Sequence, residues 1–183
     1  MSSGVFGGIF DPPHNGHVAL LRGAEEQFDF DRVLVFVVAE PGHRTVHATA
    51  QMRLSLARLA FPDYDVEPDG HARTVDLLRA RQLGDPILLI GADELLDFPN
   101  WKEPETVLKL ARLGVAARPG YARETLEPVR AGLSRPDRVR FFDIAPIPIS
   151  SSEIRALVAA GKPIDGLLPH AVAEEIERLG LYR

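Results

Sequence analysis

Residues 7–17 read GGIFDPPHNGH, and this stretch decides the fold. It lies between an apolar run at 4–9, expected to form a strand, and an amphipathic segment at 15–28, expected to form a helix. Glycines at a strand end let the backbone approach a ligand closely, and the N-terminus of a following helix attracts phosphate. The stretch therefore predicts a strand–loop–helix unit with a phosphate site at its turn.

The same stretch carries two histidines, His14 and His17. Residues three apart in a first helical turn share a face, so both imidazoles are expected to point back towards the glycines. A structural role is the alternative for each ring, either as a cap on a backbone group or as core packing. Asp11, which precedes two prolines, is expected to form the turn.

Apolar runs and amphipathic segments alternate along the rest of the chain. Strands are expected at 33–38, 86–90, 113–117 and 139–142, and helices at 50–60, 75–81, 103–110, 151–160 and 169–179. Strands that are apolar along their whole length are typical of parallel sheets covered by helices on both faces. The sequence thus predicts an α/β, Rossmann-like, open and mostly parallel sheet. A single domain over 1–183 is expected, with a small C-terminal helical extension from about 150 to 183.

Three stretches rich in proline, glycine and charge interrupt this pattern, at 40–48, 62–72 and 118–137, and are expected to be irregular. In open α/β sheets, ligands bind at the carboxyl ends of the strands. The loops that leave the predicted strands at those ends are therefore where a site is expected.

The composition narrows the range of functions. The 183 residues include 21 Lys+Arg against 26 Asp+Glu and no Cys, which gives a formal net charge of −5. Without cysteine there is no disulfide framework, thiolate nucleophile or cysteine metal site. The negative charge argues against broad binding of nucleic acid or anionic membranes, and the apolar runs are far shorter than the roughly 20 residues that cross a bilayer. With no signal-peptide pattern, a cytoplasmic protein acting on small ligands is expected.

Residues 149–155 read ISSSEIR and form a second notable stretch. Ser150 and Glu153 have the spacing of a helix capping box. The same helix start offers backbone N–H groups, hydroxyls and a positive dipole to a phosphate, and Arg155 adds a guanidinium one turn in. Taken alone, the capping role is the better interpretation, whereas the presence of residues 7–17 favours the phosphate role.

Together the two stretches resemble the GGxFDPxHxGH and IS[ST][ST]xIR signatures of the nucleotidylyltransferase superfamily. The resemblance implies transfer of a nucleotidyl group from a nucleoside triphosphate whose phosphates the two histidines hold and neutralise. It implies catalytic roles for His14, His17 and Arg155. It also implies an ATP-binding set, namely Gly7, Gly8, Ile9, Phe10, Gly16, Ile149, Ser150, Ser151 and Ser152.

Further segments resemble the bacterial nicotinate-nucleotide adenylyltransferase family, and this resemblance covers essentially the whole chain. The segments are EPGHR at 40–44, IGAD at 90–93 followed by Trp101, ARPG at 117–120 and the ending at 169–182. The resemblance implies an acceptor-binding set, namely His43, Arg44, Thr74, Gly91, Asp93, Trp101 and Arg118. At 72–78 the chain keeps Thr74 and Asp76 of the family's SYTxDTL segment but lacks its serine and tyrosine, so the contacts of this loop stay open.

Each acceptor candidate also has an ordinary structural alternative. Asp93 follows a buried strand, where it either accepts hydrogen bonds from a ribose or caps the next turn. Trp101 is the only tryptophan and follows a Pro-Asn loop, which favours stacking on a ligand ring over filling the core. A pyridinium ring over an indole gains about 0.5–2 kcal/mol of cation–π attraction. Arg44 and Arg118 either pair with an anion or carry surface charge.

The resemblance implies that nicotinate mononucleotide attacks the α-phosphorus of ATP, which yields deamido-NAD and pyrophosphate. Mg²⁺ is expected to bind mainly through the ATP phosphates, with no protein metal site. Neither nucleic acid nor a membrane is an expected partner. Nicotinamide mononucleotide and phosphopantetheine are alternative acceptors. Other classes are a non-catalytic nucleotide sensor and a metal-dependent hydrolase built on His14, His17, His43, His47 and Asp93.

Overall fold

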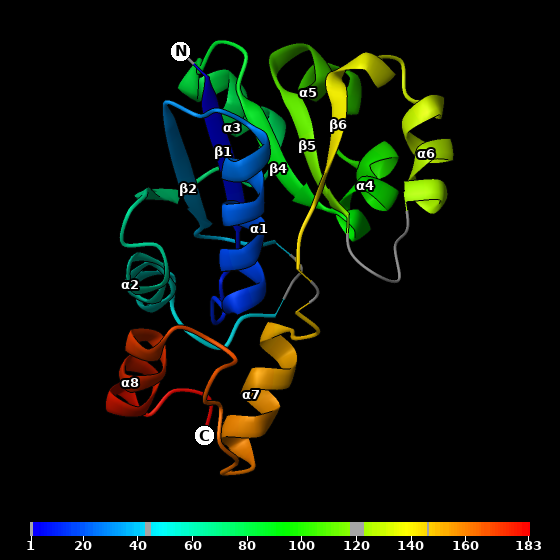
Figure 1. Cartoon of the computed structure of the whole chain (residues 1–183). Coiled ribbons are helices and arrows are strands. Elements are labelled where there is room, and N and C mark those ends of the chain that lie inside the picture. The colour runs from blue at the N-terminus through cyan, green and yellow to red at the C-terminus, as the bar shows by residue number, and fades with distance from the viewer. Residues whose placement is uncertain (1, 43–44, 118–122, 146) are drawn as a thin grey trace.

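The computed structural model describes residues 2–42, 45–117, 123–145 and 147–183. In this part of the chain, six strands form one parallel sheet in the order β3-β2-β1-β4-β5-β6 (Figure 1). β1 pairs with both β2 and β4 and therefore lies inside the sheet. The strands are β1 Ser3–Gly8, β2 Arg32–Val38, β3 Asp65–Asp69, β4 Ile87–Gly91, β5 Arg112–Ala117 and β6 Val139–Asp143.

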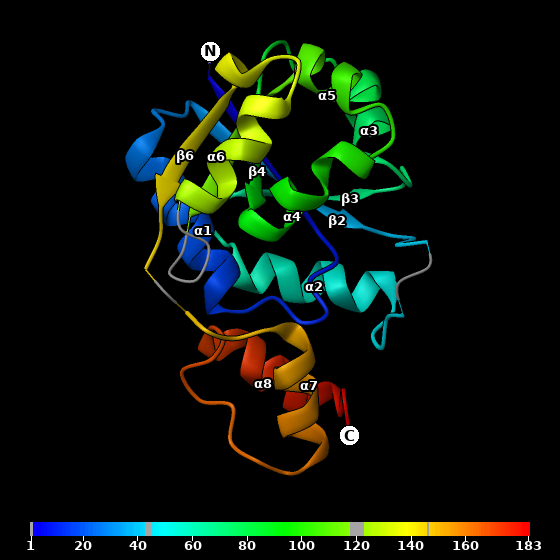
Figure 2. The same cartoon turned by 90° about the vertical axis from the view of Figure 1, so that its right-hand side faces the viewer.

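Helices cover both faces of this sheet (Figures 1 and 2). The helices are α1 Asn15–Gln27, α2 Ala50–Ala60, α3 Thr74–Arg81, α4 Ala92–Asp97, α5 Pro104–Leu110, α6 Arg123–Gly132, α7 Ser151–Ala159 and α8 His170–Leu179. α1 and α2 pack on one face, whereas α3 to α6 pack on the other. No helix in the described part of the chain is long and apolar enough to cross a membrane. The predicted α/β, Rossmann-like fold is confirmed.

Alternation along the strands assigns each buried side chain to one of two cores. Phe6 of β1 and its partner Val35 of β2 face the core under α1 and α2. Val5 and Leu34, one residue earlier in each strand, face the core under α3 to α6. Because both faces are buried, the central strands read as nearly unbroken apolar runs, which is the pattern that predicted them.

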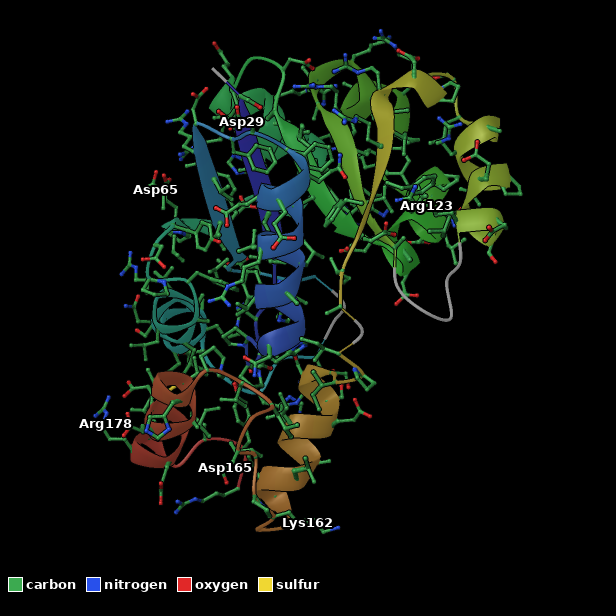
Figure 3. All side chains as sticks on the ribbon, in the orientation of Figure 1. Asp29, Asp65, Arg123, Lys162, Asp165 and Arg178 are labelled. Atoms are coloured by element: carbon green, nitrogen blue, oxygen red, sulfur yellow. The ribbon has the colours of Figure 1, made fainter. Side chains whose placement is uncertain are left out.

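α7 and α8 lie beyond the carboxyl edge of the sheet (Figures 1 and 2). Ile154 of α7 and Val172 and Ile176 of α8 are buried in the same core as α1 and α2. Charged side chains such as Lys162 and Arg178 lie on the outside of this pair of helices (Figure 3). The expected C-terminal extension therefore contributes to the core of the sheet domain.

Two stretches that were expected to be irregular contain regular elements. β3 lies within 62–72, and α6 occupies part of 118–137. β3 reads DVEPD, and a strand with proline and acidic residues is tolerated because β3 is an edge strand that pairs with β2. α6 contains Pro128, which argues against a helix when the sequence is considered alone. The sequence does not predict α4, which follows β4 directly without a loop.

The strand order reverses between β1 and β4. The chain leaves β1 into α1 on one face and leaves β4 into α4 on the other face. The connections therefore separate at the carboxyl ends of these two strands, which is where open α/β sheets bind ligands. Residues 7–14 run from the end of β1 to the start of α1 at this point, and we call them the glycine loop.

Candidate active site

The glycine loop is shaped by the side chain of Phe10. Phe10 has a φ of 54° and is 2% exposed, and its ring centroid lies 5.3 Å from that of Phe61 in the core. A Cβ on Gly8 would lie 2.6 Å from the Phe10 ring, so glycine is required there. Because the Phe10 side chain belongs to the core, a contact between this residue and ATP would come from its backbone.

His14 and His17 cap the start of α1 reciprocally. Nδ1 of His14 accepts a hydrogen bond from the Gly16 N–H, and Nδ1 of His17 accepts one from the His14 N–H, each at 3.2 Å. The two rings stack with centroids 3.8 Å apart. A Cβ on Gly16 would lie 3.0 Å from the His14 ring, so the glycine lets this ring fold back over the helix start. The cap uses Nδ1 of each ring and not Nε2.

Burial sets the charge of the two rings. Desolvation lowers the pKa of His14 to about 4, although nearby Glu153 opposes the shift. Burial, and secondarily His14, lowers the pKa of His17 well below its ordinary value of 6.5. Both rings are therefore neutral at pH 7, and because each Nδ1 accepts a hydrogen bond, each ring carries its proton on Nε2. The pair consists of neutral Nε2–H donors rather than the positive charges that the resemblance implies.

The start of α7 lies against the glycine loop. Ser150 caps α7, because its hydroxyl oxygen accepts a hydrogen bond from the Glu153 N–H at 3.2 Å and its O–H donates to the Glu153 carboxylate at 2.6 Å. Ser151 Oγ donates to the carbonyl of Pro12 at 2.8 Å, across 139 residues of sequence. The predicted cap is confirmed, and the two sequence motifs meet in space.

Arg155 joins the same two segments. Its Nη1 donates to the carbonyl of Asp11 at 2.7 Å, and its Nη2 donates to Ser152 Oγ at 3.2 Å. The guanidinium is thereby fixed at the junction of the glycine loop and α7, where its fork can pair with phosphate oxygens. Ile149 packs against the core. We call the polar groups at this junction the phosphate cluster, namely His14, His17, Ser150, Ser151, Ser152 and Arg155.

Arg53 of α2 ties together the loops after β1 and β2, a role that neither sequence motif indicates. The side chain is 1% exposed, and its guanidinium donates at 2.6 to 3.3 Å to four backbone carbonyls, those of Ile9, Val38, Ala39 and Ala48. Burial lowers the pKa of Arg53, and the charge of Asp11 opposes the shift. The sequence gives one indication that Arg53 is buried, because helix periodicity places it on the same face of α2 as Leu56 and Ala57.

Asp11 anchors the loop that follows β2. Its carboxylate accepts hydrogen bonds from the N–H groups of His47 and Ala48, at 2.7 and 3.1 Å. It also accepts a hydrogen bond from the hydroxyl of Tyr182 at 2.8 Å. A role in the local turn is all that the sequence predicts for Asp11, because these partners lie 36 to 171 residues away.

A cavity of about 770 Å³ opens beside the glycine loop, at the carboxyl ends of the central strands. Three of the predicted acceptor residues, Thr74, Asp93 and Trp101, line this cavity. Residues 7–9 of the predicted ATP-binding set also line it. The glycine loop therefore borders both the cavity and the phosphate cluster. We call this space the acceptor cavity.

Trp101 and Asp93 lie on the α4 side of the acceptor cavity. The Trp101 ring is partly buried, with its centroid 5.2 Å from that of Phe98, so it forms part of the core and part of the cavity wall. Asp93 is exposed in the first turn of α4, and the N-cap of this helix is Gly91. The capping role considered for Asp93 is therefore wrong. Gly91 donates its N–H to Glu94 at 2.7 Å and is absent from the described lining of the cavity.

The acceptor cavity is also lined by Asp69 and His71, which the sequence motifs do not indicate. Asp69, at the end of β3, is 5% exposed, and its Oδ1 accepts hydrogen bonds from His71 N–H and Nδ1 at 2.8 and 2.7 Å. Arg73 is the N-cap residue of α3 but makes no capping hydrogen bond with its side chain. Both His71 and Arg73 line the cavity. The sequence gives one signal for this part of the cavity, namely that residues 72–78, which include Arg73, depart from the family segment.

Three predicted acceptor residues, His43, Arg44 and Arg118, lie outside the described residues. His47, which was considered for a hydrolase, has its Nδ1 3.6 Å from Asp11 Oδ2 and a half-exposed side chain. Within the described ranges, no group of three His, Cys, Asp or Glu side chains is placed to hold a metal ion.

Comparison with known proteins agrees with this geometry. Residues 5–157 match the model of the cytidylyltransferase-like family. The chain is 37% identical to a Chlorobaculum parvum protein named "Probable nicotinate-nucleotide adenylyltransferase", with 100% of both chains covered. A Thermomicrobium roseum protein with the same name is also 37% identical, over 98% of this chain and 91% of that protein. The chain belongs to the nicotinate-nucleotide adenylyltransferase family.

Solved structures share the fold of this nicotinate-nucleotide adenylyltransferase family member. Two structures of Plasmodium falciparum nicotinic acid mononucleotide adenylyltransferase, complexed with APC and with NaAD, superpose with TM-scores of 0.80 and 0.81. Each is 16% identical to this chain. Both alignments cover 99% of this chain, and they cover 96% of the chain in the APC complex and 97% of the chain in the NaAD complex. Family membership confirms the prediction of a nucleotidyltransferase enzyme.

Proposed function

We propose that the chain transfers the adenylyl group of ATP to nicotinate mononucleotide in NAD biosynthesis. The observation that carries this proposal is the glycine loop, which borders the phosphate cluster on one side and the acceptor cavity on the other. A triphosphate and an acceptor phosphate can therefore meet across residues 7–9. The identity of 37% to proteins named nicotinate-nucleotide adenylyltransferase, over nearly the full length, supports this acceptor.

The reaction needs positioning more than proton transfer. An oxygen of the acceptor's 5′-phosphate forms a bond to the α-phosphorus of ATP while the bond from this phosphorus to the β-phosphate oxygen breaks, so pyrophosphate leaves. The product is deamido-NAD, and a Plasmodium falciparum neighbour was solved in complex with NaAD. Because the attacking phosphate is already an anion near pH 7, catalysis depends on alignment and on stabilising negative charge.

The phosphate cluster supplies that stabilisation. His14 and His17 donate their Nε2–H groups, and the start of α7 and the Arg155 guanidinium add positive potential. Before ATP binds, burial lowers the pKa of both rings, so they act as neutral donors. A bound triphosphate raises the pKa of each ring, because nearby negative charge favours the imidazolium.

The acceptor cavity positions the other substrate. Trp101 offers its indole face to the pyridine ring, and Asp93 accepts hydrogen bonds from ribose hydroxyls. Thr74 and Arg73 lie at the start of α3, where the helix dipole favours an anion such as the ring carboxylate. The family resemblance assigns His43, Arg44 and Arg118 to the same substrate.

Mg²⁺ is proposed as the cofactor, carried by ATP. The donor set of the phosphate cluster consists of N–H groups and hydroxyls, and the described residues contain no cluster of three metal-ligating side chains. This donor set fits the phosphate oxygens and leaves the metal to those same phosphates, since Mg²⁺ keeps several waters and binds few protein groups. Bound in this way, Mg²⁺ neutralises part of the triphosphate charge.

The proposal is tested by incubating the purified chain with ATP and Mg²⁺ and following pyrophosphate release with one acceptor at a time. Nicotinate mononucleotide is expected to give the fastest release, ahead of nicotinamide mononucleotide and phosphopantetheine. Release that is fastest with another acceptor would contradict the assigned substrate. Tight binding of ATP without release would indicate a non-catalytic sensor instead.

A further inference from the structure

A buried polar cluster lies behind the glycine loop, and the proposed reaction does not use it directly. Its members are Asp11, Arg53 and Tyr182, and Arg155 lies at its border. Asp11 is 4% exposed and Arg53 is 1% exposed, so both charges are removed from water. Buried charges persist where hydrogen bonds and an opposite charge compensate for lost hydration. We call this group the Asp11 cluster.

The Asp11 carboxylate joins three segments that are distant in sequence. Oδ1 accepts hydrogen bonds from the Ala48 N–H at 3.1 Å and from the Tyr182 hydroxyl at 2.8 Å, and Oδ2 accepts one from the His47 N–H at 2.7 Å. His47 and Ala48 belong to the loop between β2 and α2, whereas Tyr182 follows α8. Tyr182 is therefore the one side-chain hydroxyl among these three donors.

The backbone of the same aspartate fixes Arg155. Arg155 Nη1 donates to the Asp11 carbonyl at 2.7 Å. On the other side of the loop, Arg53 Nη1 donates to the carbonyl of Ile9 at 2.8 Å. Since the carboxylate and the carbonyl belong to one residue, the hydrogen bonds to the carboxylate also restrain the backbone oxygen that holds the Arg155 guanidinium.

The conformation of Tyr182 suits this role. Its φ is 64°, in a region that bulky residues rarely adopt, and its phenol is partly buried against the core. Burial and the hydrogen bond to Asp11 raise the pKa of Tyr182, so its hydroxyl stays protonated and keeps donating. The chain thus holds an uncommon backbone conformation at the residue whose hydroxyl reaches Asp11.

We propose that Tyr182 is a positioning residue for Arg155. By donating to Asp11, Tyr182 sets the place of the guanidinium that pairs with the triphosphate of ATP, and it acts without touching either substrate. The kinetic part of this proposal rests on the proposed adenylyl transfer, whereas the binding part requires only ATP.

The test compares Tyr182→Phe with Tyr64→Phe. Tyr64 is a matched control because its hydroxyl also donates to a carboxylate, that of Glu25, at 2.7 Å, and its phenol is also partly buried. Loss of a hydrogen bond to a charged group corresponds to about a tenfold effect, so Tyr182→Phe is expected to raise the KM for ATP about tenfold. The KM for nicotinate mononucleotide is expected to stay within about twofold, and Tyr64→Phe is expected to change neither constant.

An unchanged KM for ATP in folded Tyr182→Phe, or an equal rise in Tyr64→Phe, would overturn the proposal. Calorimetric titration with ATP and no acceptor provides a second readout, in which the dissociation constant is expected to rise about tenfold in Tyr182→Phe alone. If the wild-type chain binds ATP but releases no pyrophosphate with any acceptor, the proposed function fails while this titration still decides the role of Tyr182.

A second variant covers the case in which Tyr182→Phe does not fold. Asp11→Asn replaces two carboxylate oxygens by one uncharged oxygen and one NH2 group, so the Tyr182 hydroxyl meets either a weaker acceptor or an NH2 group, and its hydrogen bond to residue 11 is weakened in both orientations. It is expected to weaken ATP binding in the titration. An unchanged dissociation constant would contradict the positioning role.

Discussion

The phosphate cluster and the acceptor cavity are built in different ways. In the phosphate cluster, the polar side chains are bonded to the glycine loop or the helix starts, as Ser151 is to Pro12 and Arg155 is to Asp11. In the acceptor cavity, Arg73 and Asp93 are exposed and His71 is half-exposed. The difference shows that hydrogen bonds between distant segments hold the phosphate cluster in place, whereas the polar side chains of the acceptor cavity are more exposed. Substitutions that affect the phosphate cluster should change ATP binding or kcat, and those in the acceptor cavity should change acceptor recognition.

The largest effect is expected from replacing Arg53, the buried side chain that holds the loops behind the phosphate cluster. Arg53→Met leaves four backbone carbonyls without their donor and Asp11 without a buried counter-charge. It is expected to lower the free energy of unfolding by about 3–5 kcal/mol, measured by urea denaturation. Arg58→Met, at an exposed position on the same helix, is the control and is expected to change it by less than about 0.5 kcal/mol. Equal effects of the two variants would show that the loops do not depend on Arg53.

His17→Asn keeps the cap of α1 but removes the Nε2–H group that we propose as a donor to the triphosphate. Asparagine retains a side-chain oxygen that can accept the His14 N–H but has no group in place of Nε2–H. The kcat is expected to fall about 10²–10³-fold with ATP and nicotinate mononucleotide, by analogy with the loss of one preorganised donor. His17→Ala should lose at least as much activity. A loss below about threefold would remove His17 from the mechanism.

The lowered pKa of His14 predicts a pH-dependent stability. The unfolded chain takes up a proton at this residue near pH 6.5 and the folded chain only near pH 4, so stability is lost as the pH falls through that window. Between pH 7 and 5, the wild type is expected to lose about 2 kcal/mol relative to His14→Asn, which keeps a helix cap but does not titrate. Urea unfolding of both proteins at each pH measures this. A difference that stays constant with pH would show that His14 titrates normally when the chain is folded.

In the acceptor half, Trp101→Leu is expected to act on binding. Loss of the stacking face should raise the KM for nicotinate mononucleotide about tenfold while kcat and the KM for ATP change little. Trp101→Phe keeps an aromatic face and is the matched variant, with a smaller rise. Steady-state kinetics with each substrate varied in turn distinguishes these outcomes. A fall in kcat with no change in the KM for nicotinate mononucleotide would show that Trp101 does not act by binding the acceptor.

The smallest effect is expected at His71, at the half-exposed edge of the cavity. His71→Asn removes an imidazole whose Nδ1 donates to Asp69 and whose other side lines the cavity. The ratio of kcat/KM for nicotinate mononucleotide to that for nicotinamide mononucleotide is expected to fall about threefold, the size typical of the loss of one hydrogen bond. An unchanged ratio would show that His71 does not help the chain to distinguish nicotinate mononucleotide from nicotinamide mononucleotide.

The fold and the phosphate half could be predicted because their signals are local. Residues 7–17 and 149–155 are contiguous, and helix periodicity alone places His14 beside His17 and Ser150 at a helix start. Nearly unbroken apolar strands predicted the parallel sheet for the same reason. By contrast, β3 and α6 carry prolines at positions that only an edge strand and a tertiary context explain.

The supporting residues could not be predicted because their partners are distant in sequence. Tyr182 and Asp11 are separated by 171 residues, and Arg53 reaches the loops after two different strands. His71 lies beside the segment where the chain departs from its family, so the resemblance carried no role for it. Sequence motifs thus indicated the groups that we propose to contact phosphate, whereas the fold was needed to reveal what holds those groups in place.

The most direct test of the central claim is the stoichiometry of products. Purified chain, ATP, Mg²⁺ and nicotinate mononucleotide are incubated together, and deamido-NAD and pyrophosphate are quantified in the same samples over time. The two halves of the site, working across the glycine loop, predict one deamido-NAD for each pyrophosphate and none when the acceptor is omitted. Pyrophosphate or phosphate released without a matching amount of dinucleotide would contradict adenylyl transfer and point to ATP hydrolysis.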